Sequence, residues 1–296
     1  MPELETVAVL GTGLMGAPMA RNIARAGMRV RAWNRTREKA APLADEGIEI
    51  SESPADAVAS ADAAITMLTS GDVVREVMAD EGNALANMGE DAVWLQMSTV
   101  GIAATEELQG LAREAGVAFL DAPVLGTKQP AEEANLIVVA AGPRDAIERC
   151  KPVFDAVGSR TITLEEPGDA TRLKLVLNNW VLSVTVATAE TIGLAERLGI
   201  DPGRFLDAIE GGNLDSAYAR LKGRMMIERS FEPSFPLGLA AKDARLVLEA
   251  AREAGETDPA LPAAIERRLS QAEELGHGAD DMAAVYLGIA GDDDGT

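Results

Sequence analysis

A chain of 296 residues is long enough for two domains that each bury a core, and its hydrophobic fraction of 47% and charged fraction of 25% are ordinary for a globular protein. The formal net charge of −21 argues against nucleic acid and anionic membrane surfaces as partners, because phosphate groups are bound by clustered lysines and arginines. One cysteine, Cys150, rules out an internal disulfide, and one histidine, His277, rules out a histidine-based zinc site and argues against a Ser-His-Asp hydrolase.

The N-terminal segment predicts a dinucleotide-binding unit. Residues 6–10 have the pattern of a buried parallel strand, an amphipathic helix ends near residue 27, and a second strand covers residues 28–35. The turn after the first strand carries a GxGxxG motif formed by Gly11, Thr12, Gly13, Leu14, Met15 and Gly16. In the order strand, glycine turn, helix and strand, this motif binds a pyrophosphate at the helix N-terminus. We assign all six residues to cofactor binding; a glycine-rich turn without a ligand is the less favoured alternative.

The end of the second strand indicates which nucleotide binds. A site specific for NAD has Asp or Glu there to bind the ribose 2′-hydroxyl. This chain has Asn34, Arg35, Thr36 and Arg37 instead, and two guanidinium groups suit a 2′-phosphate. Two solvated arginines are the alternative, although cations at a helix N-terminus are mildly unfavourable. We expect NADP(H) to be preferred, with NAD(H) possible, and the first three of these residues to contact the cofactor.

Strands and helices continue to alternate up to about residue 165. Further strands are expected at residues 63–68, 92–97, 117–121, 136–141 and 161–164. Ligands of an open α/β sheet bind beyond the carboxyl ends of its strands. Candidates for the nicotinamide side are therefore Met67, Leu68, Ser98 and Thr99; the two hydroxyl residues are also candidate helix caps. A loop rich in Pro and Gly at residues 121–132 is a candidate substrate loop.

Residues 168–199 predict one long helix that is apolar on almost every face. At about 1.5 Å per residue it is longer than a small domain is wide, which is typical of a helix that runs between domains or subunits. Lys174 lies in its apolar first half, and Asn178 follows one turn later on the same face. This lysine either extends its ammonium to solvent or is held in a pocket. Only helices are expected after it, and we expect disorder in the last six residues, 291–296.

These patterns predict an α/β fold in which a Rossmann-type domain, residues 1–165, precedes an all-helical substrate and dimerisation domain, residues 166–296. One helical domain can hardly bury so apolar a helix on every side, so a homodimer or homotetramer is expected. The N-terminus has no signal-peptide pattern and no run of 18 apolar residues occurs. We therefore expect no membrane association and a cytoplasmic location.

Several segments together resemble the β-hydroxyacid dehydrogenases, also called the 3-hydroxyisobutyrate dehydrogenase-like family. In the family's order these are VLGTGLMGAPMARNI, WNRT, ITML, MSTV, DAPVLGTKQPAEEANLIVVAAG, GDATRLKLVLNN and FPLGLAAKDARLVLE. They cover nearly the whole chain, and the KQPAEEANLIVVAAG segment is most similar to the glyoxylate/succinic semialdehyde reductase branch. The resemblance implies an NAD(P)-dependent dehydrogenase or reductase that acts on the CH–OH or C=O group of a small hydroxyacid or semialdehyde.

The resemblance also implies roles for single residues. The family's catalytic lysine falls on Lys174, its partner asparagine on Asn178 and its nicotinamide-side threonine on Thr99. The lysine that closes over the cofactor falls on Lys242, which precedes Asp243. Substrate contacts are expected from Ser98, Leu125, Gly126, Thr127, Lys174 and Asn178.

The substrate loop departs from the family at one position. The family usually has S-G-G or S-G-S there, and its serine holds the carboxylate end of the substrate. This chain has Leu125, Gly126 and Thr127, so a hydroxyl donor is replaced by an apolar wall. A bulkier or less polar aldehyde or ketone is therefore a candidate substrate.

Hydride transfer to or from a carbonyl carbon requires a proton at the carbonyl oxygen. With no usable histidine, Lys174 is the best-placed general acid/base, and an apolar helix face favours a lysine pKa nearer neutrality. Asn178 is placed to orient the lysine or the substrate oxygen. Two other functions stay open: an imine reductase on the same scaffold, which Leu125 favours slightly and Lys174 disfavours, and a non-catalytic NADPH-binding module, which the lysine–asparagine pair disfavours.

Overall fold

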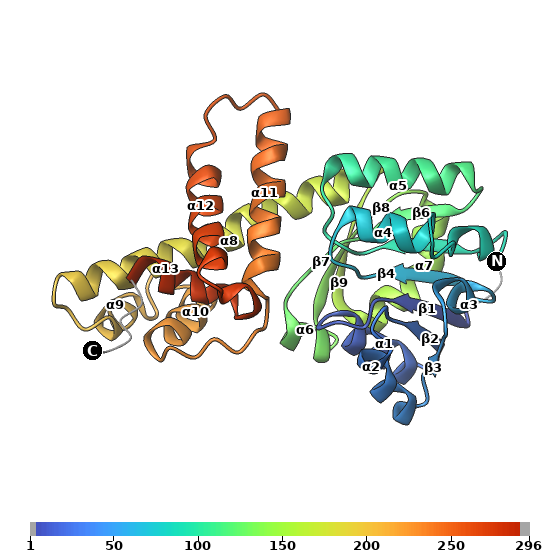
Figure 1. Ribbon diagram of the computed structural model, residues 1–296, viewed down its shortest axis with the longest axis horizontal. Helices are drawn as coiled ribbons and strands as arrows, with labels where there is room; N and C mark the ends of the chain where they lie inside the picture. Colours follow the sequence, from blue (N-terminus) through green and yellow to red (C-terminus); the bar gives the residue numbers. More distant parts are fainter. Residues whose placement is uncertain (1–3, 291–296) are drawn as a thin grey trace. The chain divides into compact units, whose positions relative to one another are not determined.

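The computed structural model describes residues 4–290, so the disorder expected for residues 291–296 lies outside the described residues. The chain forms two compact units, Met1–Lys174 and Leu175–Thr296, referred to here as the first and second units (Figure 1). The division falls inside the long helix α8 (Asp169–Arg197), whereas the predicted domain boundary at residue 165 precedes that helix.

A nine-stranded sheet is the centre of the first unit. Its order is β3-β2-β1-β4-β5-β6-β8-β7, and β9 also pairs with β8. The strands are β1 (Thr6–Leu10), β2 (Arg29–Trp33), β3 (Glu49–Ile50), β4 (Ala63–Thr66), β5 (Val93–Gln96), β6 (Ala118–Asp121), β7 (Val124–Leu125), β8 (Leu136–Ala141) and β9 (Gly158–Leu164). The pairings from β3 to β6 are parallel, which confirms the predicted fold class, and β8 runs antiparallel to β6 and β7.

Helices cover both faces of this sheet (Figure 1). They are α1 (Gly16–Arg25), α2 (Arg37–Ala40), α3 (Pro54–Val58), α4 (Gly71–Met78), α5 (Ile102–Glu114), α6 (Lys128–Glu132) and α7 (Arg144–Val157), with 3-10 helices η1 (Ala41–Glu46) and η2 (Leu85–Asn87). One core packs Met19 of α1 and Phe154 of α7 against the sheet, and the other contains Val74 of α4 and Leu108 of α5. Because both faces are covered, the central strands β1, β4 and β5 are buried at every residue rather than at alternate residues.

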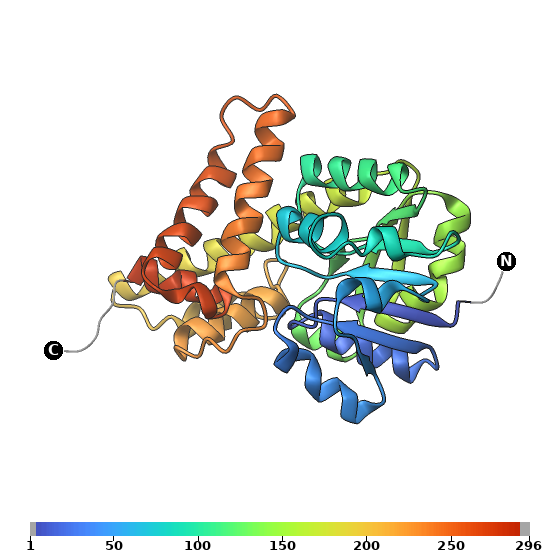
Figure 2. The ribbon, with the colours of Figure 1, turned by 45° about the vertical axis from the view of Figure 1, so that its right-hand side comes forward.

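The second unit is entirely helical, as predicted. After α8 come α9 (Gly203–Ile209), α10 (Ala217–Ile227), α11 (Leu237–Glu253), α12 (Ala260–Glu274), η3 (His277–Ala279), η4 (Met282–Tyr286) and α13 (Leu287–Ala290). Helices α11 and α12 lie side by side as an antiparallel pair (Figure 2). The core joins Leu182 and Ile192 of α8 to Ala240 of α11, Leu269 of α12 and Val285 of η4.

Helix α8 is less buried than its composition suggests. It passes a length and hydropathy test for a membrane span, but 44% of its most apolar window is buried in this chain. A core helix of a soluble protein passes the same test, and one face of α8 packs into the core of the second unit. Val176 and Trp180 remain exposed, so the helical domain of one chain does not bury this helix on every side.

A buried ion pair joins two distant segments of the second unit. Lys222 Nζ lies 2.6 Å from Asp281 Oδ1, and both side chains are 0% exposed. Asp281 also accepts hydrogen bonds from the backbone and side chain of Ser234 and from the N–H of Ala283. Burial raises the pKa of the Asp281 carboxyl, but the Lys222 ammonium and the N–H donors outweigh this and hold it below its ordinary value.

Replacing Lys222 by Met keeps the aliphatic volume and leaves a buried carboxylate without its cation. We expect the free energy of unfolding at pH 7 to fall by about 3–5 kcal/mol in urea titrations. A carboxyl group whose pKa is lower in the folded protein than in the unfolded chain stabilises the fold at pH values above its ordinary pKa. That stabilisation is lost as the pH falls through the folded-state pKa. The deficit of Lys222→Met should therefore shrink below about pH 4.

The matched control is Arg29→Met, because Arg29 and Glu5 form a surface pair whose side chains are 74% and 69% exposed. Its effect should stay within about 0.5 kcal/mol. An equal loss in the two variants would contradict a special contribution from the buried pair.

Candidate functional site

The glycine turn between β1 and α1 has the geometry of a pyrophosphate-binding loop. Gly11 has φ +101°, and a Cβ added there would lie 2.3 Å from Met67 O. A Cβ on Gly16 would lie 1.9 Å from Gly11 O, so helix and strand meet too closely for any side chain. At Gly13, by contrast, a Cβ would meet nothing within 4 Å. Two glycines are needed for packing, and the third leaves open space beside the backbone.

Polar groups around this turn fit a bound phosphate. Thr12 is buried, yet its Oγ1 has no hydrogen-bond partner among the described residues. Its N–H donates to Asn34 Oδ1 at 3.1 Å, and the Asn34 amide donates to Thr36 O at 2.9 Å. Helix α1 begins at this turn without a side-chain cap. The orphaned hydroxyl, the open space and the uncapped helix all suit an anionic ligand.

A cavity of about 460 Å³ opens at the carboxyl ends of β1, β2 and β4, within the first unit. It is lined by seven of the predicted cofactor residues: Gly11, Gly13, Asn34, Arg35, Thr36, Met67 and Leu68. Its cations are Arg35, which the sequence predicted, and Lys39, which the sequence analysis did not single out. Arg37, expected to face a 2′-phosphate, instead forms an ion pair with Glu52 at 2.5 Å.

Three of the residues predicted to contact the cofactor or the substrate do not line this cavity. Met15 packs against the core of the first unit, and Leu14 is partly exposed; neither lines the cavity. Ser98 is buried, where its Oγ donates to Thr66 O at 3.1 Å and accepts from the N–H of Leu68 at 2.9 Å. Its hydroxyl thus ties the ends of β4 and β5 together, and its predicted contact with the substrate stays a prediction. Thr99 follows it at the same edge and is half-buried.

The candidate substrate loop is shaped by one glycine. Leu125 pairs with Ile137 in the short antiparallel strand β7 and is half-buried. Gly126 has φ +138°, and a Cβ there would lie 2.6 Å from Leu136 Cδ2, so the position requires glycine. Thr127 is the N-cap of α6 but makes no capping hydrogen bond with its side chain.

A buried carboxylate fixes the first turn of α8. Asp121, the last residue of β6, accepts hydrogen bonds from Thr171 N at 2.7 Å and Thr171 Oγ1 at 2.8 Å. The Thr105 hydroxyl lies 3.1 Å from that of Thr171. Burial raises the pKa of the Asp121 carboxyl to about 6 against the opposing effect of the Thr171 hydrogen bonds. Lys174 follows Thr171 by one turn and is only 8% exposed.

Asn178 belongs to a polar network in the second unit. Its Nδ2 donates to Asp243 Oδ2 at 2.8 Å, and Lys242 Nζ forms an ion pair with Asp243 Oδ1 at 2.8 Å. Asn178 and Asp243 are both buried, so the carboxylate fixes how the amide is turned. Asp243 and Asp121 are positioning residues that sequence reasoning missed, since neighbours in the chain do not reveal such long-range bonds. The predicted contact of Lys242 with the cofactor stays a prediction.

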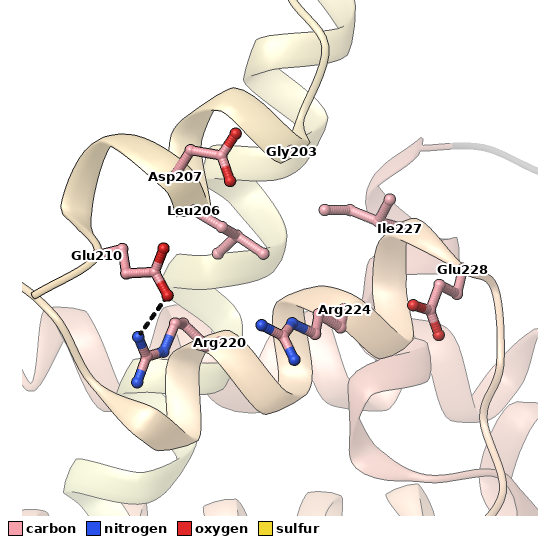
Figure 3. Close-up of a pocket in the computed structure, with 8 residues that line it drawn as sticks. All are labelled: Gly203, Leu206, Asp207, Glu210, Arg220, Arg224, Ile227 and Glu228. Carbon is pink, nitrogen blue, oxygen red and sulfur yellow. Dashed lines mark hydrogen bonds and ion pairs between the residues drawn. The ribbon is translucent and has the colours of Figure 1, made fainter.

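A second cavity, of about 210 Å³, lies between α9 and α10. Figure 3 shows Arg220 turned toward Glu210, and Arg220 also pairs with Asp215 at 3.0 Å. Arg224 and Glu228 line the same cavity, so both charge signs are present. No predicted site residue lines it.

Comparison with known proteins agrees with the site. Residues 6–165 match the NAD binding domain of 6-phosphogluconate dehydrogenase, and residues 168–287 match the family described as NAD-binding of NADP-dependent 3-hydroxyisobutyrate dehydrogenase. Two Arabidopsis thaliana proteins, glyoxylate/succinic semialdehyde reductases 2 and 1, are each 33% identical over 96% of this chain and over 79% and 98% of their own lengths. The crystal structure of 3-hydroxyisobutyrate dehydrogenase from Salmonella typhimurium has a TM-score of 0.87 at 26% identity, over 95% of this chain and 99% of that one. The chain therefore belongs to the 3-hydroxyisobutyrate dehydrogenase-like family and is an NAD(P)-binding oxidoreductase of the β-hydroxyacid dehydrogenase type.

Proposed function

We propose that this protein is an NADP(H)-dependent reductase or dehydrogenase of semialdehyde- or hydroxyacid-type substrates, with Lys174 as general acid/base. The observation that carries the proposal is the position of Lys174, a lysine buried on α8 one turn after the anchored Thr171. In a protein of this family, a buried amine beside a fixed amide supports proton transfer at a carbonyl oxygen. The names of the 33% identical relatives support semialdehydes as the substrate class.

Each residue of the proposed active site has its own role in the reaction. A bound nicotinamide supplies or accepts the hydride. In reduction, Lys174 donates a proton to the carbonyl oxygen as negative charge develops there, and in oxidation it removes that proton from the alcohol. Asn178, with its amide held by Asp243, orients the oxygen from the next turn of α8. Asp121 holds the preceding turn, so the lysine is carried by a helix that is fixed on both sides.

Preference for NADP(H) rests on charge at the nucleotide cavity. Arg35 and Lys39 line it, and the end of β2 carries no carboxylate to bind a ribose 2′-hydroxyl. A 2′-phosphate gains charge-assisted hydrogen bonds from both cations. The substrate side is less polar than in most family members, because Leu125 occupies the usual serine position, and this favours a carbonyl compound with an apolar portion.

Replacing Lys174 by Ala should lower kcat for NADPH-dependent carbonyl reduction by about 10²- to 10⁴-fold, because the proton donor is lost. The assay follows NADPH and NADH oxidation with glyoxylate, succinic semialdehyde, methylmalonate semialdehyde, a bulky aldehyde and a cyclic imine. NADPH binding, measured by fluorescence titration, should be unchanged.

The control is Lys151→Ala, which removes an exposed lysine paired with Asp155 and should leave kcat unchanged. If Lys174→Ala still reduces the cyclic imine, the protein is an imine reductase instead. NADPH binding without turnover of any compound would contradict the catalytic proposal and favour a binding module.

Arg35→Ala and Lys39→Ala should each raise the KM for NADPH by about 10-fold or more while leaving the KM for NADH nearly unchanged, since only NADPH has the 2′-phosphate. Arg37→Ala is the matched control: its guanidinium pairs with Glu52, so little change is expected. Equal losses with both cofactors would show that these cations do not select the phosphate.

Gly13→Ala and Gly16→Ala separate cofactor binding from folding. A Cβ on Gly13 enters open space, so the thermal midpoint should hold while the Kd for NADPH rises by about 10-fold, a loss of roughly 1.4 kcal/mol. A Cβ on Gly16 would collide with Gly11 O, so this variant should unfold several degrees lower. Thermal unfolding without cofactor, followed by NADPH titration, tests both, and a normal midpoint for Gly16→Ala would contradict the packing argument.

A further inference from the structure

A buried network of polar side chains lies at the carboxyl ends of β4 and β5. Its members Thr66, Trp94 and Gln96 are 0% exposed. Trp94 Nε1 donates to Thr66 Oγ1 at 2.9 Å, and Thr66 Oγ1 donates to Gln96 Oε1 at 3.2 Å. Gln96 Oε1 also accepts from Ser98 N at 2.9 Å, while Gln96 Nε2 donates to Ser98 O at 2.8 Å. One amide side chain therefore holds both backbone polar groups of Ser98.

The indole of Trp94 sets the direction of these hydrogen bonds. An indole N–H can only donate, so the Thr66 hydroxyl accepts from it and uses its own proton on Gln96 Oε1. The amide oxygen of Gln96 is thereby kept toward Thr66 and its NH2 group toward Ser98 O. The Ser98 hydroxyl accepts from Leu68 N and donates to Thr66 O. If one of these side chains turns, a buried polar group is left without a partner, so the network holds a single arrangement.

The topology of the sheet places the nicotinamide half of the cofactor beside this network. Arg35 and Lys39, which suit a 2′-phosphate, line the cavity beyond β2, and the glycine turn for the pyrophosphate follows β1. In the sheet, β2 and β4 lie on opposite sides of β1, and β5 is the next strand after β4. A dinucleotide that binds across this edge therefore has its nicotinamide on the side of β4 and β5. Leu68, whose N–H the network holds, lines the same cavity.

We propose that Gln96 is a positioning residue for the nicotinamide end of the cofactor. Its side chain is fully buried, so it acts on the ligand through Ser98. The backbone of Ser98 leads directly to Thr99, and its hydroxyl holds Leu68 at the edge of the cavity. The inference deepens the proposed function and rests on its cofactor, NADP(H). All of these residues belong to the first unit.

A cofactor fragment without the nicotinamide ring tests the proposal. ADP-ribose 2′-phosphate lacks only that ring, so the ratio of its Kd to the Kd of NADP+ measures what the ring contributes. We expect a ratio of about 10 or more for the wild type, and a ratio near one for Gln96→Met, which keeps the length of the side chain and removes its hydrogen bonds. The Kd for ADP-ribose 2′-phosphate should itself stay within about twofold, as measured by calorimetric titration.

Equal losses of affinity for the two ligands would show that Gln96 only maintains the cavity as a whole, and would overturn the proposal. An unchanged ratio would overturn it as well. If the wild type prefers NAD+, the preference in the proposed function is wrong, and NAD+ and ADP-ribose then give the same comparison for Gln96.

Thr66→Val is a milder variant, because it keeps the shape of the side chain and removes only the hydroxyl that orients the amide. It should lower the same ratio by a smaller factor, and it keeps the test decisive if Gln96→Met does not fold. The matched control is Thr188→Val in the second unit. Thr188 is 5% exposed and its hydroxyl donates to Val184 O at 2.7 Å within α8. If this control lowered the ratio equally, the effect would be a general one of losing a buried hydroxyl and the proposal would fail.

Kinetics with saturating NADPH separates positioning from binding. Gln96→Met should lower kcat for carbonyl reduction by about 10-fold even when the site is filled, because a small misplacement of the reacting groups slows the transfer. A raised KM for NADPH with unchanged kcat would contradict a positioning role. The binding ratio needs no carbonyl substrate, so its outcome is separate from that of the proposed reaction.

Discussion

The hydrogen bonds between Asp121 and the first turn of α8 are the constraint on which the candidate active site depends. The carboxylate at the end of β6 holds both the N–H and the hydroxyl of Thr171, and Lys174 follows one turn later. A buried acceptor with two donors fixes the first turn of the helix against the end of β6 more narrowly than apolar packing does. The same helix then presents Asn178 to Asp243 and continues as the central element of the second unit. One helix thus carries both the proposed proton donor and the proposed orienting amide.

The shape of the nucleotide cavity depends more on the close packing of the backbone than on side chains. Because Gly11 and Gly16 have no side chains, β1, α1 and the end of β4 can pack close together. Asn34, which follows β2, accepts a hydrogen bond from the turn. The remaining open space beside Gly13 and the unpartnered Thr12 hydroxyl are where an anion gains most. In the proposed function, the backbone of this turn binds the phosphates that NAD and NADP share, and Arg35 and Lys39, which line the cavity, select the 2′-phosphate.

The second unit contains two buried polar groups of different kinds. The Lys222–Asp281 pair is fully enclosed and every Asp281 oxygen has donors, so it joins α10 to the segment that begins η4. In contrast, the Asn178–Asp243–Lys242 network ends in a lysine that is partly exposed. A fully buried ion pair whose carboxylate oxygens all accept hydrogen bonds suits a structural role. A network that ends in a partly exposed lysine can bind a ligand.

The sequence by itself determined the α/β class, the glycine turn, the long helix and the family, because strand and helix periodicity and the GxGxxG spacing are local patterns. It did not reveal β3 and β7, which have two residues each and are too short for any periodicity. It also did not reveal the hydrogen bonds of Ser98 to Thr66 and Leu68 or the ion pair of Arg37 with Glu52. Which hydroxyl bridges two strand ends, and which cation is diverted to Glu52, depends on residues far away in the chain. Only the tertiary structure decided those pairings, and likewise the hydrogen bonds of Thr171 to Asp121 and of Asn178 to Asp243. The physical reason is that hydrogen bonds form between groups that the fold brings close together, whatever their separation along the chain.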